Sequence, residues 1–417
     1  MNGPQIDRRG LLAGTAATAL ALGLRPGSVG AQSGDVVYWH QFAAQAVVVG
    51  FERVVELFGE AYPDIVLSSE TIPNADFMQK FTAAVVADSR PDTTMVSAER
   101  FPDMQAMGGL VDLTDRIESW PRRAAFPDDR FDSVRADGRI YGVPAFSFVN
   151  WVYYRKDWFE EAGIETPPDT MEGFLDAALR ITDPARGRYG FGMRGGDGGA
   201  PYITDMMRAW GSPIVVDGQV ALDRQTAIEA VRFYAELYTE HEVVPPSAPN
   251  DSFRQIMEGF KTGQTGMIWH HTGSLQEIRT AFPDGNFGTM VRPAGPAARI
   301  AQVSYLYNGL MSERNADAAW AWVSFWGEAE PSLAFLELTG YVPVATDVLA
   351  DPRLTDDPIY AAATRTMEFG VGPLSFVGAD GWERTVVTPE FQKILTGTST
   401  VEDAVDQMIL GLERTLR

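Results

Sequence analysis

The sequence of 417 residues contains no cysteine and no excess of basic side chains. Without cysteine the chain has no disulfide bond, no thiolate metal site and no cysteine nucleophile. Its formal net charge of −22 argues against a nucleic-acid backbone or an anionic membrane as the binding partner. Solubility is the simpler consequence of the same charge.

Several catalytic and metal-binding patterns are also missing. There is no G-x-S-x-G elbow, no H-E-x-x-H helix and no metal-ligand cluster. The glycine run 195–199 lacks the lysine and the following serine or threonine of a phosphate-binding loop. His270 and His271 are neighbours, so on one strand they point to opposite faces and cannot share a metal ion. We therefore expect no metal site and no cofactor, and a protein that is not an enzyme.

The amino-terminal residues 1–31 have the pattern of a targeting segment. Arg8 and Arg9 precede an apolar stretch from Leu11 to Leu24, and Val29-Gly30-Ala31 is a small-residue cleavage signal. The apolar stretch is too short for a stable membrane anchor. The two arginines before a weakly hydrophobic stretch resemble a twin-arginine signal, which exports folded proteins. We expect export, with removal of the signal peptide near Ala31.

The remaining chain is long enough for two domains, each with its own core. Its first part alternates apolar and amphipathic segments, which predict strands at 36–40, 65–67 and 94–96 and helices around 51–58 and 77–85. This alternation implies a mostly parallel sheet covered by helices. In such sheets ligands bind at the carboxyl ends of the strands, so the loops that follow these strands are candidate binding loops.

The alternation restarts later in the chain. It predicts helices at 174–181, 231–238, 253–260, 315–326 and 401–412, and strands at 189–193, 267–269 and 303–311. The three tryptophans Trp320, Trp322 and Trp326 lie on one of these helices, and we interpret them as packing residues. No internal repeat or long flexible linker separates the segments.

The segment from Ile140 to Arg194 has the most specific pattern. A turn at Gly142-Val143-Pro144 leads into a strand-like run rich in aromatic residues. A helical segment follows, and then Pro167-Pro168-Asp169-Thr170 forms a turn that caps the next helix. Three other blocks share the same order along the chain: a helix–glycine–strand element at 253–270, a strand and helix at 303–344, and a final helix at 400–416.

In order and spacing, these four blocks resemble the family 1 extracellular solute-binding proteins of ABC importers, which are sugar-binding and maltose-binding-protein-like. The resemblance implies an α/β protein with the periplasmic-binding-protein type II fold, in which a hinge joins two α/β lobes and the ligand cleft lies between them. It implies a first lobe of residues 32–143 and 300–344, and a second lobe of residues 144–299 and 345–417. Ligand contacts made only when both lobes meet would favour a closed form, which the membrane permease recognises.

The same resemblance implies a periplasmic, monomeric substrate-binding component that captures a small carbohydrate and delivers it to the permease subunits. Proteins of this kind generally need a lipid-modified amino-terminal cysteine where no outer membrane confines them, and this chain has no cysteine. We therefore expect free diffusion in a Gram-negative periplasm, with a small-molecule ligand and no nucleic acid as partner.

Candidate ligand contacts follow from the chemistry of sugars, whose C–H faces pack on aromatic rings and whose hydroxyls need amide or carboxylate partners. The candidates at predicted strand ends, loops and the crossing segment are Trp39, His40, Gln41, Glu99, Asn150, Trp151, Asp197, Trp210, Trp269, Tyr305 and Trp382. Each aromatic residue could instead pack in a core, and each polar one could cap a helix, close a turn or pair with a neighbour. The sequence leaves both interpretations open.

The ligand class also stays open. A mono- or oligosaccharide or a polyol is the leading interpretation. A polyamine would need acids in an aromatic box, and a phosphorylated or sulfonated sugar would need an arginine such as Arg100, Arg194 or Arg208 in the cleft. A secreted carbohydrate-active enzyme would need two carboxylates at a defined separation, which the many acidic residues of this chain do not exclude.

Overall fold

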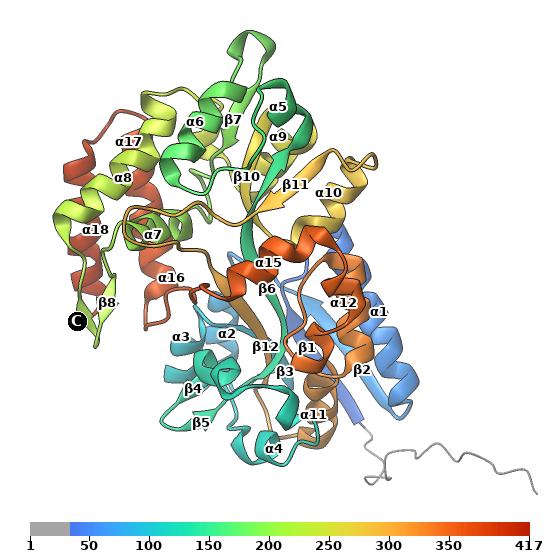
Figure 1. Ribbon diagram of the computed structural model, residues 1–417. Helices are drawn as coiled ribbons and strands as arrows, with labels where there is room; N and C mark the ends of the chain where they lie inside the picture. The colour runs from blue at the N-terminus through green and yellow to red at the C-terminus, as the bar shows by residue number, and fades with distance from the viewer. Residues whose placement is uncertain (1–33) are drawn as a thin grey trace, which may run out of the picture.

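The structure is a computed structural model that describes residues 34–417. The expected signal peptide 1–31 lies outside the described residues. Figure 1 shows two lobes, with the long strand β6 (Val143–Arg155) running from one into the other. We call the lobe that contains the amino-terminal strands lobe 1, and the other lobe 2.

Lobe 1 combines early and late parts of the chain. Its strands are β1 (Gly34–His40), β2 (Ile65–Thr71), β3 (Thr93–Ser97), β4 (Arg135–Ala136), β5 (Arg139–Ile140) and β12 (Val303–Leu310). Its helices are α1 (Gln45–Ala61), α2 (Phe77–Val86), α3 (Phe101–Ala106), α4 (Thr114–Glu118), α11 (Ala316–Phe325) and α12 (Ala329–Thr339). Short helices α13 (Thr346–Leu349), α14 (Pro352–Thr355) and α15 (Ala361–Met367) follow α12.

Lobe 2 contains the middle of the chain and its carboxyl-terminal helices. Its strands are β7 (Tyr189–Gly192), β8 (Val215–Val216), β9 (Gln219–Val220), β10 (Thr265–His271) and β11 (Phe287–Met290). Its helices are α5 (Lys156–Glu161), α6 (Met171–Ile181), α7 (Ala200–Ala209), α8 (Arg224–Thr239), α9 (Phe253–Lys261), α10 (Leu275–Ala281), α16 (Ala379–Trp382), α17 (Thr388–Leu395) and α18 (Val401–Thr415). A π-helical turn, Glu383–Val387, joins α16 to α17.

Strand β6 connects the sheets of the two lobes. The strand order is β2-β1-β3-β12-β6-β10-β7, and β11 also pairs with β6. The first half of β6 is antiparallel to β12, from Val143 to Val149, while its second half pairs with β10 and β11. Strands β1, β2 and β3 are parallel, as the alternating sequence pattern predicts. The crossing segment predicted from the sequence therefore includes the strand that links the lobes.

The expected elements are present. Each predicted strand and helix of the sequence pattern overlaps an element of the same type, including the three early strands and the last amphipathic helix. The predicted cap also forms, because the Thr170 hydroxyl accepts a hydrogen bond of 3.1 Å from the Gly173 backbone N–H at the start of α6. Trp322 and Trp326 pack in the core beside α1, as predicted for that helix.

Two hydrophobic cores lie on either side of the crossing strands. The first is formed by the lobe 1 sheet with α1, α11 and α12, and it continues along β6 to α9 and α10. The second lies beneath α6, α7, α8, α17 and α18. After α12, the residues from Val348 to Met367 pack on the first core, and those from Leu374 onward pack on the second. The packing thus changes later in the chain than residue 345, and the exact lobe boundaries stay a prediction.

Within residues 34–417, no helix is long and apolar enough to cross a membrane.

Candidate functional site

A cavity of about 530 Å³ lies where the two lobes meet. Its walls come from loops of lobe 1, from the crossing strands β6 and β12, and from loops and carboxyl-terminal helices of lobe 2. Its volume lies in the usual range of small-molecule sites, and it stands at the carboxyl ends of the parallel strands. We call it the interlobe cavity.

The lobe 1 wall consists of the loops that follow β1, β2 and β3. Gln41, Asn74 and Glu99 line the cavity from these three loops. Arg100 is buried, and its Nη2 donates to the Asn74 side-chain oxygen at 2.9 Å and to the Asn74 carbonyl at 3.2 Å. Its guanidinium carbon lies 5.5 Å from the centre of the Phe77 ring. Packing and hydrogen bonds therefore fix the position of this cation at the edge of the cavity.

The two crossing strands supply alternate residues to the cavity. Phe146, Phe148 and Asn150 line it from β6, and Ser304 and Leu306 line it from β12. This spacing of two is that of one face of a strand, so the residues between them point away from the cavity. Gln302, immediately before β12, also lines the cavity and is almost fully buried.

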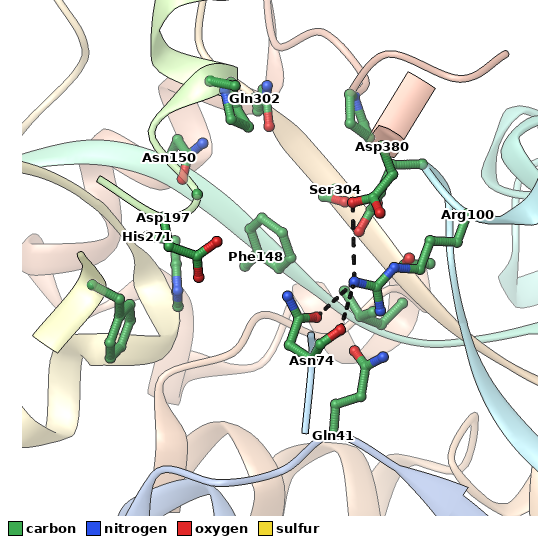
Figure 2. Close-up of a pocket in the computed structure, with 18 of the residues that line it drawn as sticks. Gln41, Asn74, Arg100, Phe148, Asn150, Asp197, His271, Gln302, Ser304 and Asp380 are labelled. Atoms are coloured by element: carbon green, nitrogen blue, oxygen red, sulfur yellow. Dashed lines mark hydrogen bonds and ion pairs between the residues drawn. The ribbon is translucent and has the colours of Figure 1, made fainter. Parts of the chain in front are cut away.

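The lobe 2 wall brings together the glycine loop and the last helices. Asp197 and Gly198 line the cavity from the loop 195–199, which is held by hydrogen bonds from the Gly195 and Gly196 backbones to the segment 248–251. From α16 and the following π-helical turn come Asp380 and Glu383. The Asp380 carboxylate lies 4.0 Å from Arg100 Nη2, so an ion pair joins the two lobes across the cavity (Figure 2).

Two side chains of the cavity are held in their neutral forms near pH 7. Burial raises the pKa of Glu383 to about 8, and the negative charges of Asp205 and Glu99 add to the effect. The Thr204 hydroxyl donates to the Glu383 carboxyl at 3.1 Å, which partly opposes the shift. Burial, assisted by the charge of Arg194, lowers the pKa of His271 to about 3. Glu383 therefore carries a proton and His271 does not.

An aromatic strip covers one side of the cavity. The ring of His271 lies 5.1 Å from that of Phe148, 5.8 Å from that of Tyr341 and 5.9 Å from that of Phe253. All four rings line the cavity. Such a strip can pack against the C–H faces of a ligand, while the polar groups on the other walls hydrogen-bond to it.

Several buried polar atoms of the walls have no hydrogen-bond partner within residues 34–417. They include Ser97 Oγ, Ser304 Oγ, His271 Nδ1 and two nitrogens of Arg100. Buried polar atoms without partners are uncommon because they cost free energy. At a cavity wall they indicate positions where a bound ligand or water completes the hydrogen bonding. No three His, Asp or Glu side chains in this part of the chain are grouped to hold a metal ion.

Comparison with known proteins identifies the family. Residues 37–331 match the model of the bacterial extracellular solute-binding proteins. The chain belongs to this family. A Brucella abortus binding protein is 25% identical over 341 residues, 81% of each chain, and a maltotriose-binding protein of Pyrococcus abyssi is 24% identical over 339 residues, 78% of this chain and 70% of the other.

A solved structure shows the same fold. It is an ABC transporter solute-binding protein of Thermotoga lettingae bound to α-D-tagatose, with a TM-score of 0.83, 20% identity, and coverage of 92% of this chain and all of the other. The type II binding-protein fold predicted from the sequence is therefore confirmed. The two lobes and the interlobe cavity described above belong to this fold.

The structure brings four of the eleven sequence candidates to the cavity: Gln41, Glu99, Asn150 and Asp197. The other seven do not line it. Four of these are tryptophans buried in the cores. Trp39 packs on the lobe 1 side with Lys80 over its ring, and Trp151 contacts Tyr153 on the face of β6 opposite Asn150. Because Trp39 and Trp151 do not line the cavity, the structure gives no support to their assignment as ligand contacts.

The remaining two tryptophans of this group belong to the lobe 2 core. Trp269 stacks on Tyr234 with their ring centres 5.4 Å apart, and Arg292 also lies over the Trp269 ring. Trp382 donates its indole N–H to the Met408 carbonyl at 2.9 Å. Neither ring faces the cavity, because each is held among the helices that cover the second core.

The last three candidates outside the cavity have other local partners. His40 is buried, and its Nδ1 accepts a 3.2 Å hydrogen bond from the Phe42 backbone, which closes the turn after β1. Trp210 packs on Phe233 at the end of α7. Tyr305 lies on β12 between two cavity-lining residues, so its ring points to the opposite face, under Arg130.

Sequence reasoning missed several residues of the cavity. Phe148 could have been predicted, because it lies two residues before Asn150 on one strand and therefore shares its face. Asn74 ends a loop that the strand pattern marks as a binding loop. Gln302, Tyr341 and Glu383 have no local signal, since their place at the cavity depends on how distant segments return to it.

Proposed function

We propose that this chain is the substrate-binding component of an ABC importer that captures a small uncharged carbohydrate, either a mono- or oligosaccharide or a polyol. The observation that carries the proposal is the pairing, in one interlobe cavity, of an aromatic strip with amide, hydroxyl and neutral titratable groups. Carbohydrates need this combination of ring faces and hydrogen-bonding groups. The maltotriose and tagatose ligands of the similar proteins support the same class.

The charges around the cavity favour an uncharged ligand over an anionic one. Three of the arginines that line it already have partners: Arg100 is bound to Asn74, Arg194 donates to the Asp197 carbonyl at 2.7 Å, and Arg254 pairs with a neighbouring glutamate. These contacts leave part of each guanidinium free, but they already satisfy some of the donors that a phosphate or sulfonate group would need. The acidic side chains of this cavity attract a polyamine less strongly than their number suggests, because Glu383 is neutral.

In this proposal the protein works as a periplasmic monomer after removal of its signal peptide. It binds without turnover, and the closed, ligand-bound form is the one that the permease recognises. Closure would draw on contacts between the lobes such as the Arg100–Asp380 pair.

The test uses the mature protein, residues 32–417, in a thermal-shift screen followed by calorimetric titration. D-Tagatose and maltotriose represent neutral carbohydrates, spermidine represents polyamines, and glucose 6-phosphate represents sugar phosphates. A ligand of the folded form raises the melting temperature. We expect stabilisation by a neutral carbohydrate that is recovered unchanged. Stabilisation only by spermidine or glucose 6-phosphate, or a new product in the mass spectrum, would refute the proposal.

A matched pair of variants tests the site. Phe148 and Tyr305 are both half-buried, lie on adjacent crossing strands and point to opposite faces. Phe148→Leu should weaken carbohydrate binding about fivefold or more, because stacking on an aromatic ring contributes roughly 1 kcal/mol. Tyr305→Leu should leave the affinity unchanged. Equal effects of the two substitutions would mean that the aromatic strip is not the binding surface.

A further inference from the structure

A buried polar cluster lies directly behind the cavity wall at Gln302. Asp205, on α7, is fully buried and does not line the cavity. One of its carboxylate oxygens accepts a 2.7 Å hydrogen bond from Arg292 Nη1. The other accepts a 3.3 Å hydrogen bond from the side-chain amide nitrogen of Gln302. Asp205 thus contacts a cavity-lining residue from a place that a ligand in the cavity does not touch.

The position of the carboxylate is itself fixed. Arg292 is fully buried, with its guanidinium carbon 4.3 Å from the centre of the Trp269 ring and 5.6 Å from that of Tyr202. Arg208 approaches the same carboxylate at 3.5 Å and donates to the Gly372 carbonyl. A buried ion pair contributes little net stability, since desolvation offsets the attraction. We therefore expect the cluster to have a role other than stabilising the core.

The chemistry of the contact fixes the orientation of the Gln302 amide. A carboxylate paired with arginine only accepts hydrogen bonds, so the amide must present its NH₂ group to Asp205. Its oxygen, Oε1, is then the group left for the cavity. A free glutamine can turn its amide by half a turn and offer either a donor or an acceptor. Here the buried carboxylate holds one N–H of the amide, so the NH₂ end stays at Asp205 and Oε1 stays on the cavity side.

We propose that Asp205 is a positioning residue for specificity: by holding Gln302 with its Oε1 toward the cavity, it selects ligands that donate a free hydroxyl group at this point. This inference rests on the proposed function. An ether, keto or carboxylate oxygen at the same place of the ligand would meet Oε1 acceptor to acceptor and be rejected. Sites that hydrogen-bond a ligand hydroxyl discriminate strongly against analogues that lack it.

The test exchanges the donor and the acceptor. Asp205→Asn turns the buried acceptor into an amide that can donate, which frees Gln302 to rotate. Gln302→Glu places two carboxylates against each other. The double variant Asp205→Asn/Gln302→Glu keeps the net charge of the cluster, and the introduced glutamate again presents an acceptor to the cavity. A cycle of these variants isolates the coupling between the two positions.

The binding readout is calorimetric titration with D-tagatose and with maltotriose. We expect each single variant to weaken binding roughly five- to tenfold, the range for one neutral hydrogen bond. The double variant should return to within about threefold of the unsubstituted protein. Additive losses in the double variant would overturn the proposal, because a merely structural role predicts no recovery. Asp223→Asn, at the exposed cap of α8, is the control and should bind normally.

A second readout needs no ligand. The side-chain NH₂ signal of Gln302, identified by its loss in Gln302→Glu, should exchange slowly with solvent in the unsubstituted protein and fast in Asp205→Asn. Fast exchange in the unsubstituted protein would refute the positioning role. If neither sugar binds, the proposed function fails while this signal still decides the positioning. If Asp205→Asn does not fold, recovery of the double variant relative to Gln302→Glu decides it.

Discussion

Replacing Glu383 by glutamine should change how the stability of this protein depends on pH. The Glu383 carboxyl lies at the interlobe cavity, is buried, and accepts a hydrogen bond from Thr204. Its pKa is raised from the usual 4.5 to about 8, mainly by burial. Glutamine has nearly the same shape, can accept the same hydrogen bond and does not ionise. The substitution therefore removes the titration with little change in packing.

The sign of the effect follows from proton linkage. Between about pH 4.5 and pH 8 the folded protein holds a proton on Glu383 that the unfolded chain has released, so its stability falls as the pH rises. Moving a pKa across this interval corresponds to roughly 5 kcal/mol, because each unit is worth about 1.4 kcal/mol. This is an upper limit, since water entry or local rearrangement would reduce it. Glu383→Gln has no such titration, so its unfolding free energy should rise relative to that of the unsubstituted protein as the pH rises.

The assay is urea unfolding of both proteins at about pH 5, 6.5 and 8, followed by tryptophan fluorescence. The difference in unfolding free energy, variant minus unsubstituted, should be small at the lowest pH and grow by several kcal/mol toward the highest. Glu240→Gln removes an exposed carboxyl at the end of α8 and serves as the control. A difference that is constant across this range would refute the reasoning, because it would mean that Glu383 ionises normally.

Two other predictions concern the walls of the cavity. Gly195→Ala should lower the unfolding free energy by about 1–3 kcal/mol in urea titrations, since a Cβ there would lie 2.5 Å from the Ala248 carbonyl oxygen. The control Gly59→Ala, which has open space around it on helix α1, should instead raise the unfolding free energy by up to about 1 kcal/mol. A lower unfolding free energy in both variants would contradict the steric argument. Asp380→Asn should weaken carbohydrate binding about two- to fivefold near 0.05 M salt and less near 0.5 M, because it removes the counter-charge of Arg100. The same loss of affinity at both salt concentrations would argue against an electrostatic contact between the lobes.

Local patterns predicted the framework and part of the site. The alternation of strands and helices located β1, β2 and β3, and the rule for parallel sheets then indicated the loops that carry Gln41 and Glu99. Asn150 was found through the crossing segment. These predictions succeed because they depend on short stretches of chain whose periodicity is set by the backbone.

The aromatic candidates on strands lie away from the cavity for one reason. A strand places successive side chains on opposite faces, but a sequence does not say which face meets the ligand. Asn150 and Trp151 are adjacent, so only one of them can face the cavity, and burial in the core accounts for the other. Glu383 could not be predicted for a different reason, because its position depends on helices near the carboxyl terminus folding back onto the cavity.

The position of β12 in the sheet has a consequence for the time course of synthesis. This strand lies between β3 and β6, yet it is made long after both. Until it emerges, β3 has an unpaired edge beside the place that β12 will fill, and unpaired edges are sites of aggregation. At the usual rate of 5–20 residues per second, the delay between these strands is on the order of 10–40 seconds. The nascent chain must therefore remain protected from neighbouring chains until lobe 1 closes around its late strand.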